Sequence, residues 1–161
     1  LGTKFNVKAY PDDKTVETSL IRGSVEVTVK TRPEEKYLLK PNQKLILMNE
    51  AYAEKIAEHQ SLPAKAPVIF IRQLSYIKGD TNAIETSWVR NKLIFEDEPF
   101  VDMAKRMERW YDVKFDFKNK KIEEERINVA FDGETLVQAL DYLKLIVRFN
   151  YKIEDKKAVI Y

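Results

Sequence analysis

Apolar and polar residues alternate along the first part of the chain, from residue 5 to residue 48. Successive side chains of a β-strand point to opposite faces of its sheet, so this alternation predicts strands with one buried face and one solvated face. Turn-forming residues separate the runs about every ten residues, at 11–14, 22–24 and 40–43. The pattern predicts an all-β module of short antiparallel strands, stacked or closed into a small barrel.

The alternation stops over residues 49–66. Residues 51–57 carry a weak helical signal, 61–67 contain two prolines and indicate an exposed loop, and 68–71 predict one more strand. Residues 78–82 are polar and rich in turn formers, so a domain boundary is expected near 78–87. We therefore expect an all-β domain over residues 1–86 and a second domain over 87–161.

The second region contains an internal sequence repeat of two copies. Phe95 and Phe131 are 36 positions apart (131 − 95), and each is followed by apolar residues at i, i+3, i+4, i+7, i+10 and i+11, the stripe of an amphipathic helix. The first stripe is Phe100, Met103, Ala104, Met107, Trp110 and Tyr111, and the second is Leu136, Ala139, Leu140, Leu143, Ile146 and Val147. Each stripe lies between two strand-like runs. The pattern predicts a repeated β-α-β unit, with the two helices sharing one core.

The starts of both helices carry matching signals. Pro99 suits the first turn, and the acidic residues 96–98 suit the positive end of the helix dipole, which favours a helix start over a metal site. Thr135 and Gln138 have the spacing of a capping box. The charged segment 118–126 is expected to be a solvated loop. The predicted fold class is therefore mixed: an all-β module, then a small α+β domain with two helices packed on a sheet.

Composition excludes several kinds of chemistry. The 161 residues carry a formal net charge of +2, too small by itself to indicate a nucleic-acid or membrane-surface partner. With no cysteine and a single histidine, His59, the chain offers no thiol nucleophile, zinc–thiolate site or Ser–His–Asp arrangement. Its four glycines are scattered, with no phosphate-binding loop. We expect no enzyme, no cofactor and no metal site.

No apolar run reaches the roughly 18–20 residues that a membrane helix needs. The chain opens at Leu1 directly into a strand pattern. We expect a fragment whose targeting or anchoring segment lies upstream.

A repeated strand–helix–strand unit is also the outline of RNA-binding sheets, which display aromatic residues on an exposed face. Residues 127–131 lack the basic-Gly-aromatic signature of such sheets. Phe115 and Phe117 correspond to Tyr151 and Ile153 in the second copy, which favours a core role. Trp110 and Tyr111 also favour core over a recognition platform, whereas Trp88 could pin the linker to one module or pack between both.

Several motifs, taken in order, resemble the FecR domain of bacterial anti-sigma regulators and the domain that often follows it. The FecR-like motifs are Leu1-Gly2-Thr3-x-Phe5-x-Val7-x-Ala9-Tyr10, Val16-Glu17-Thr18-Ser19-Leu20, Gly23-Ser24-Val25-Glu26-Val27 and Leu39-Lys40-Pro41-Asn42-Gln43. Those of the following domain are Trp88-x4-Leu93-x-Phe95, Pro99-Phe100, Glu108-Arg109-Trp110-Tyr111-x-Val113 and Phe131-x-Gly133-Glu134-Thr135-Leu136-x2-Ala139-Leu140-x2-Leu143. This second domain is similar to the short N-terminal domain of secretins and TonB-dependent receptors. Between about residues 50 and 86 the chain is longer than the usual pattern.

The resemblance implies the periplasmic portion of a single-pass inner-membrane regulator that takes part in cell-surface signalling. Such proteins bind an extracytoplasmic-function (ECF) sigma factor through a cytoplasmic N-terminal segment, which is absent from this chain. The periplasmic portion senses the signalling domain of an outer-membrane TonB-dependent transporter, and so controls transcription. The implied partners are that signalling domain and, through the absent segment, the sigma factor.

Recognition without chemistry is expected to use strand addition or surface docking, because a β module offers unpaired edges. The apolar residues Val159, Ile160 and Tyr161 are a candidate partner-binding edge, although the same pattern fits an interior strand. The alternative function is a non-regulatory envelope module, for example one that binds glycan. Exposed aromatic residues among Tyr10, Tyr37 and Tyr52 would favour that alternative.

Overall fold

The computed structural model describes residues 2–30, 32–48 and 69–161. The chain divides into two compact units, Leu1–Thr86 and Ser87–Tyr161. Strands dominate the first, and helices pack against strands in the second, so the mixed fold class is confirmed. The expected helix at 51–57, the loop at 61–67, Tyr52 and His59 lie outside the described residues.

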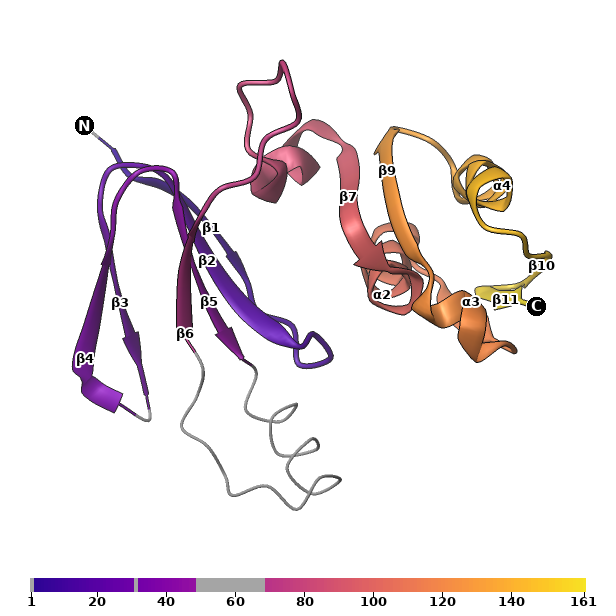
Figure 1. Ribbon diagram of the computed structural model, residues 1–161, viewed down its shortest axis with the longest axis horizontal. Coiled ribbons are helices and arrows are strands. Elements are labelled where there is room, and N and C mark those ends of the chain that lie inside the picture. Colours follow the sequence, from indigo (N-terminus) through magenta and orange to yellow (C-terminus); the bar gives the residue numbers. More distant parts are fainter. Residues whose placement is uncertain (1, 31, 49–68) are drawn as a thin grey trace. The chain divides into compact units, whose positions relative to one another are not determined.

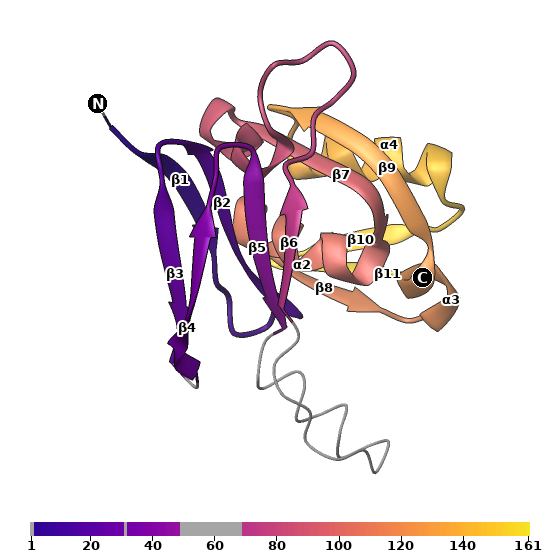
Figure 2. The same cartoon turned by 60° about the vertical axis from the view of Figure 1, so that its left-hand side comes forward.

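The N-terminal unit is built from short antiparallel strands (Figures 1 and 2). They are β1 (Lys4–Lys8), β2 (Thr15–Arg22), β3 (Val25–Val29), β4 (Arg32–Leu39), β5 (Gln43–Met48) and β6 (Ile69–Gln73). One sheet has the order β1-β2-β5-β6, and β3 and β4 form a separate two-stranded sheet. All pairings are antiparallel, as the alternation and the turn spacing predict.

The core of this unit lies between the two sheets. Leu20 on β2, Leu39 on β4 and Leu45 on β5 are buried together. Phe5 and Val7 on β1 alternate as a buried face would, yet both side chains are more than half exposed. They stay exposed because β1 is a terminal strand of its sheet and the core forms over β2 and β5.

In the segment after β6, the side chain of Glu85 contacts Lys44 of the sheet. Glu85 accepts from Lys44 Nζ at 2.6 Å and from the backbone N–H of Ser75 at 3.2 Å. Leu74 and Ala83 in this segment are buried. The polar turn expected at 78–82 forms, and a 3-10 helix, η1 (Ile84–Arg90), follows it.

The C-terminal unit contains the repeated β-α-β pattern. Its elements are β7 (Lys92–Pro99), α2 (Phe100–Tyr111), β8 (Lys114–Phe117), α3 (Lys120–Glu124), β9 (Arg126–Asp132), α4 (Leu136–Ile146), β10 (Tyr151–Glu154) and β11 (Lys157–Ile160). The strands form two sheets, an antiparallel pair β7-β9 and a three-stranded sheet of order β10-β11-β8. An RNA-binding unit would join its strands into one sheet with an exposed aromatic face, which this topology does not provide.

The pairing of β7 with β9 shows that the repeat is structural. Leu93 pairs with Phe131, and Phe95 pairs with Val129. Moving each residue by the 36-position repeat converts the first pair into the second. The register is therefore unchanged when the two copies are exchanged, as expected for two related strands around a local two-fold axis.

One core unites the two copies. Met107 on α2 and Leu143 on α4 are fully buried in the same cluster, together with Phe95 and Phe131. The rings of Phe95 and Phe131 meet edge to face, with centroids 6.2 Å apart. Trp110, Tyr111, Phe115 and Phe117 pack against this cluster, so the prediction of a core role for them is confirmed.

Two local predictions for this unit are wrong. The charged segment 118–126 is not simply a solvated loop, because α3 forms within it and buries Ile122. Asn119 caps this helix by accepting from the backbone N–H of Lys121 at 3.0 Å. Ile146 is 54% exposed instead of buried, because α4 ends there and the backbone turns to an extended conformation at Val147.

The starts of the two long helices differ in chemistry. Pro99 precedes the first helical residue of α2 and gives no side-chain cap. Thr135 and Gln138 form the predicted capping box at α4. The acidic residues before α2 make ion pairs, Asp97 with Arg126 at 2.7 Å and Glu98 with Arg106 at 2.8 Å.

Candidate protein-interaction surfaces

The C-terminal strand lies in the interior of its sheet. β11 pairs with β10 on one side and with β8 on the other, so its backbone offers no open edge. Ile160 is buried, Val159 is half-buried, and the side chain of Tyr161 is 54% exposed. The backbone of Tyr161 also exchanges hydrogen bonds with Asn150, at 2.9 and 2.7 Å. A partner strand therefore cannot pair with β11 at Val159 and Ile160, because both sides of this strand are already paired. Contact of a partner with the side chain of Tyr161 stays a prediction.

The N-terminal unit presents an edge at β1, which is the first strand in the order of its sheet (Figure 1). Phe5 and Val7 add apolar side chains to this edge, exposed by 54% and 53%. An edge of this kind can accept a further strand.

Two of the tyrosines that would favour a glycan site, Tyr10 and Tyr37, lie among the described residues. Tyr10 is 46% exposed, whereas Tyr37 packs against the core and donates its hydroxyl hydrogen bond to Glu35. This bond raises the pKa of Tyr37, and together with the Arg32 guanidinium it lowers the pKa of Glu35.

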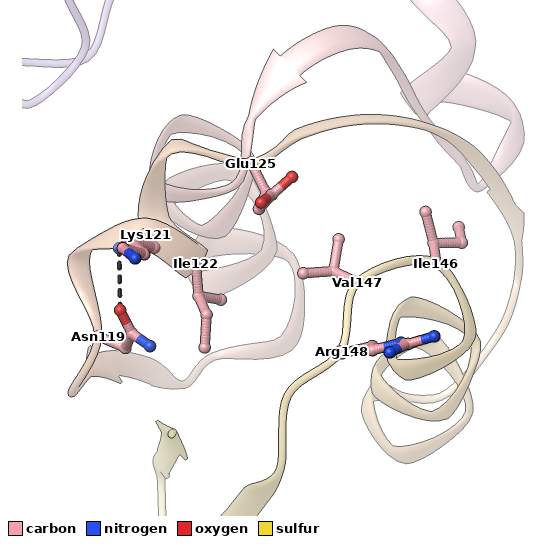
Figure 3. Close-up of a pocket in the computed structure, with 7 residues that line it drawn as sticks. All are labelled: Asn119, Lys121, Ile122, Glu125, Ile146, Val147 and Arg148. Carbon is pink, nitrogen blue, oxygen red and sulfur yellow. Dashed lines mark hydrogen bonds between the residues drawn. The ribbon is translucent and has the colours of Figure 1, made fainter.

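A pocket of about 340 Å³ lies between α3 and the end of α4 (Figure 3). Ile122 and Val147 are buried and lie on opposite sides of it, and they form its apolar floor. Its lining is completed by Asn119, Lys121, Glu125, Ile146 and Arg148. The capped start of α3 positions Lys121, and the sharp end of α4 positions Ile146 and Arg148. The site is thus an apolar floor with a charged rim.

Apolar side chains continue from this pocket along the outer face of α4. Tyr142, Leu145 and Ile146 are 49%, 84% and 54% exposed. They have the i, i+3, i+4 spacing that makes helix residues neighbours. The signal was present in the sequence, since Tyr142 and Leu145 are apolar positions outside the buried stripe.

Several carboxylates of the C-terminal unit form surface ion pairs that lower their pKa. The guanidinium of Arg126 lowers the pKa of Asp97, and Lys118 followed by Lys157 lowers that of Asp116. Across the residues that the structure describes, no group of three His, Cys, Asp or Glu side chains is placed to hold a metal ion. The described surface of the C-terminal unit therefore offers exposed apolar area and charged side chains for binding.

The helices were also compared with the length and hydropathy needed to cross a membrane. Over the described parts of the chain, none is both long enough and apolar enough to do so.

One known family matches the C-terminal unit. Residues 92–160 match the family described as FecR, C-terminal. No curated protein matches the chain.

Two solved structures share the fold of the whole chain. Both are crystal structures of a protein from Parabacteroides distasonis that is provisionally assigned as an anti-sigma factor. The first is 24% identical with a TM-score of 0.72, and the match covers 100% of this chain and 65% of that chain. The second is 23% identical with a TM-score of 0.70, and the match covers 98% and 62%. The chain therefore spans less than two thirds of the length of these structures.

Proposed function

We propose that this chain, whose residues 92–160 match the family described as FecR, C-terminal, is the periplasmic sensing portion of a transmembrane anti-sigma regulator. In this role it receives a signal from a TonB-dependent outer-membrane transporter and controls an ECF sigma factor through a cytoplasmic segment. The family match carries the proposal. The shared fold with two structures provisionally assigned as anti-sigma factors supports it.

The two units have different parts in this proposal. Leu1–Thr86 is the FecR-like all-β domain, and Ser87–Tyr161 is a domain similar to the short N-terminal domain of secretins and TonB-dependent receptors. Exposed apolar surface on β1 and on α4 gives both units area for protein contact. Contact areas of this kind mark interaction sites when several apolar side chains adjoin.

Signal transmission follows from differential affinity. A change in the transporter alters the state of the regulator only if its signalling domain binds this chain with a different affinity before and after cargo is loaded. No bond is made or broken in the relay. The physical requirement is a docking surface together with a partner that has two states.

The direct test is a calorimetric titration of the whole chain with the isolated signalling domain of the TonB-dependent receptor encoded beside its gene. We expect saturable binding in the micromolar range. Absence of binding at tens of micromolar would reject direct docking. A membrane helix and a cytoplasmic domain upstream of this chain, together with a neighbouring sigma-factor gene, are the genetic expectation.

A further inference from the structure

Three exposed apolar side chains adjoin on the last turns of α4. Leu145 is 84% exposed, the highest exposure of any large apolar residue described, and Tyr142 and Ile146 are its neighbours on the helix surface. A single exposed leucine is ordinary on a soluble protein. Three adjoining side chains that continue into a pocket indicate a contact surface.

Cations without a carboxylate partner gather at the same place. Most lysines and arginines of Ser87–Tyr161 contact a carboxylate: Lys92, Lys105, Arg106, Lys114, Lys118, Arg126, Lys152, Lys156 and Lys157. Among the described residues of this unit, those with no carboxylate contact are Lys120, Lys121, Lys144 and Arg148. Lys144 lies over the ring of Tyr151, 5.5 Å from its centroid. All four are on α3 or at the end of α4.

Helix electrostatics explains only half of this group. Lys144 and Arg148 lie at the negative end of α4, where a cation is favourable. Lys120 and Lys121 lie in the first turn of α3, where a cation opposes the dipole. The helix dipole therefore does not account for the cations at the start of α3, whereas recognition of a negatively charged group uses them.

The pocket joins the two sets of cations. Lys121 lines it from α3 and Arg148 from the end of α4, with Ile146 beside Arg148 (Figure 3). The buried side chains of Ile122 and Val147 provide a floor that fits an apolar side chain. Glu125 also lines the pocket, and Glu123 and Glu124 lie on the same short helix. These carboxylates disfavour a phosphate-dense partner such as a nucleic acid or a lipid surface.

We propose that one surface of the C-terminal unit docks a protein segment that carries an apolar anchor flanked by carboxylates. This α3–α4 surface consists of Lys120, Lys121, Lys144, Leu145, Ile146 and Arg148. The proposal rests on the proposed function in one respect, since it makes this segment part of the receptor's signalling domain. The apolar anchor contacts Leu145 and Ile146 and enters the pocket. The carboxylates pair with the rim cations, which gives orientation and a salt-dependent association rate.

The first experiment repeats the titration with variants of the whole chain. Leu145→Gln is expected to weaken the affinity for the signalling domain about tenfold, as loss of a contact anchor does. The double variant Lys121→Glu/Arg148→Glu is expected to weaken it by a similar factor at low salt and to reduce the salt dependence. Two controls make comparable changes in the N-terminal unit, one apolar-to-polar substitution and one double charge reversal. They are Leu38→Gln, at a leucine that is 61% exposed, and Lys30→Glu/Lys78→Glu.

The second experiment tests the surface without the receptor. A synthetic peptide with two leucines flanked by glutamates is titrated into the isotope-labelled whole chain, and backbone amide shifts are followed by NMR. Shifts are expected at the α3–α4 surface. A peptide with lysines in place of the glutamates is expected to leave them unchanged, as are vesicles of anionic phospholipid.

The outcomes separate the two proposals. If the signalling domain binds and the surface variants match wild type, or the controls weaken binding equally, the surface is wrong and the proposed function stands. If the signalling domain does not bind, direct docking is rejected and the peptide titration alone decides the surface. Peptide shifts elsewhere, no shifts, or equal shifts with the lysine peptide or the vesicles overturn it.

Discussion

Gly23 holds the turn at which the chain passes from one sheet of the N-terminal unit to the other. It lies between β2 and β3 with φ at +92°, a conformation that side-chain-bearing residues rarely adopt. A Cβ atom placed there would lie 2.7 Å from Thr3 Oγ1 and 3.0 Å from Thr3 Cα. Both backbone conformation and space therefore require glycine at this position.

We expect Gly23→Ala to lower the free energy of unfolding of the N-terminal unit by about 1–3 kcal/mol, the cost of strained backbone plus displacement of Thr3. Urea unfolding followed by hydrogen exchange measures it. Gly79→Ala is the matched control, because Gly79 has φ at +87° but nothing within 4 Å of an added Cβ. Equal losses in both variants would show that the contact with Thr3 costs nothing.

Tyr111 links the end of α2 to the residues that precede α4. Its hydroxyl donates to the backbone carbonyl of Glu134 at 3.0 Å. Burial raises the pKa of this phenol, and the negative charge of Glu134 adds to the shift. The folded state therefore holds the proton more tightly than the unfolded chain does.

Because the pKa of Tyr111 is higher in the folded state than in the unfolded chain, the stability of the protein falls at high pH. The contribution of Tyr111 to stability is complete below its ordinary pKa near 10, and it is lost as the pH rises through the higher folded pKa. We expect Tyr111→Phe to lose less stability than wild type as the pH rises above about 10. Urea midpoints at each pH test this, with Tyr142→Phe on the exposed face of α4 as the control. Parallel pH profiles for wild type and Tyr111→Phe would contradict it.

At the scale of elements, α4 begins with a complete capping box. Thr135 Oγ1 accepts from the backbone N–H of Gln138 at 3.3 Å, and the Gln138 side chain accepts from the backbone N–H of Thr135 at 2.9 Å. These bonds satisfy amide groups that a helix start otherwise leaves without partners.

We expect Thr135→Ala to destabilise the C-terminal unit by about 1 kcal/mol, because it removes the accepting hydroxyl. Thr135→Ser should retain most of the stability, since serine provides the same oxygen. Urea unfolding followed by the fluorescence of Trp110, which packs against this core, measures both. A serine variant as unstable as the alanine variant would assign the loss to the threonine methyl group instead.

Elements defined by local periodicity were predictable from the sequence, and those defined by distant pairing were not. The apolar stripe of α2 and the cap of α4 are local signals, and both appear where expected. α3 was missed because a five-residue helix with one buried residue, Ile122, has no repeated apolar position to detect.

The interior position of β11 shows the same limit for strands. β11 pairs with β8 in parallel across about forty residues of chain, and alternation alone cannot distinguish an edge strand from an interior one. The α3–α4 surface shares this limit. Leu145 and Tyr142 were visible as apolar residues off the stripe, but the lack of partners for Lys120 and Lys121 requires the folded neighbourhood.

At the scale of the whole molecule, the two units have separate interiors. The core of the first is the cluster of Leu20, Leu39 and Leu45, and that of the second unites both copies of the repeat. No buried cluster among the described residues contains members of both units. Separate interiors imply that each unit loses its packing without requiring the other to do so.

This separation gives a prediction for matched core truncations, one in each unit. Met107→Ala should lower the stability of the C-terminal unit by about 2–5 kcal/mol, and Leu39→Ala should lower that of the N-terminal unit by a similar amount. Both side chains are fully buried, so the two cavities are comparable in kind. Residue-resolved hydrogen exchange should show faster exchange only in the unit that carries the change. Uniform acceleration across both units would mean a single cooperative fold.

The repeat makes a sharper prediction within the C-terminal unit. Met107 and Leu143 occupy equivalent positions 36 residues apart, and both belong to one buried cluster. Truncations that share neighbours do not add, and coupling energies of about 0.5–3 kcal/mol are typical. We expect Met107→Ala/Leu143→Ala to differ from the sum of the single variants by an amount in this range. Met107→Ala/Leu39→Ala, which combines the two units, should be additive within about 0.5 kcal/mol. Additivity in the first pair would mean that the two copies bury their stripes independently, and coupling in the second would mean that the units share an interior.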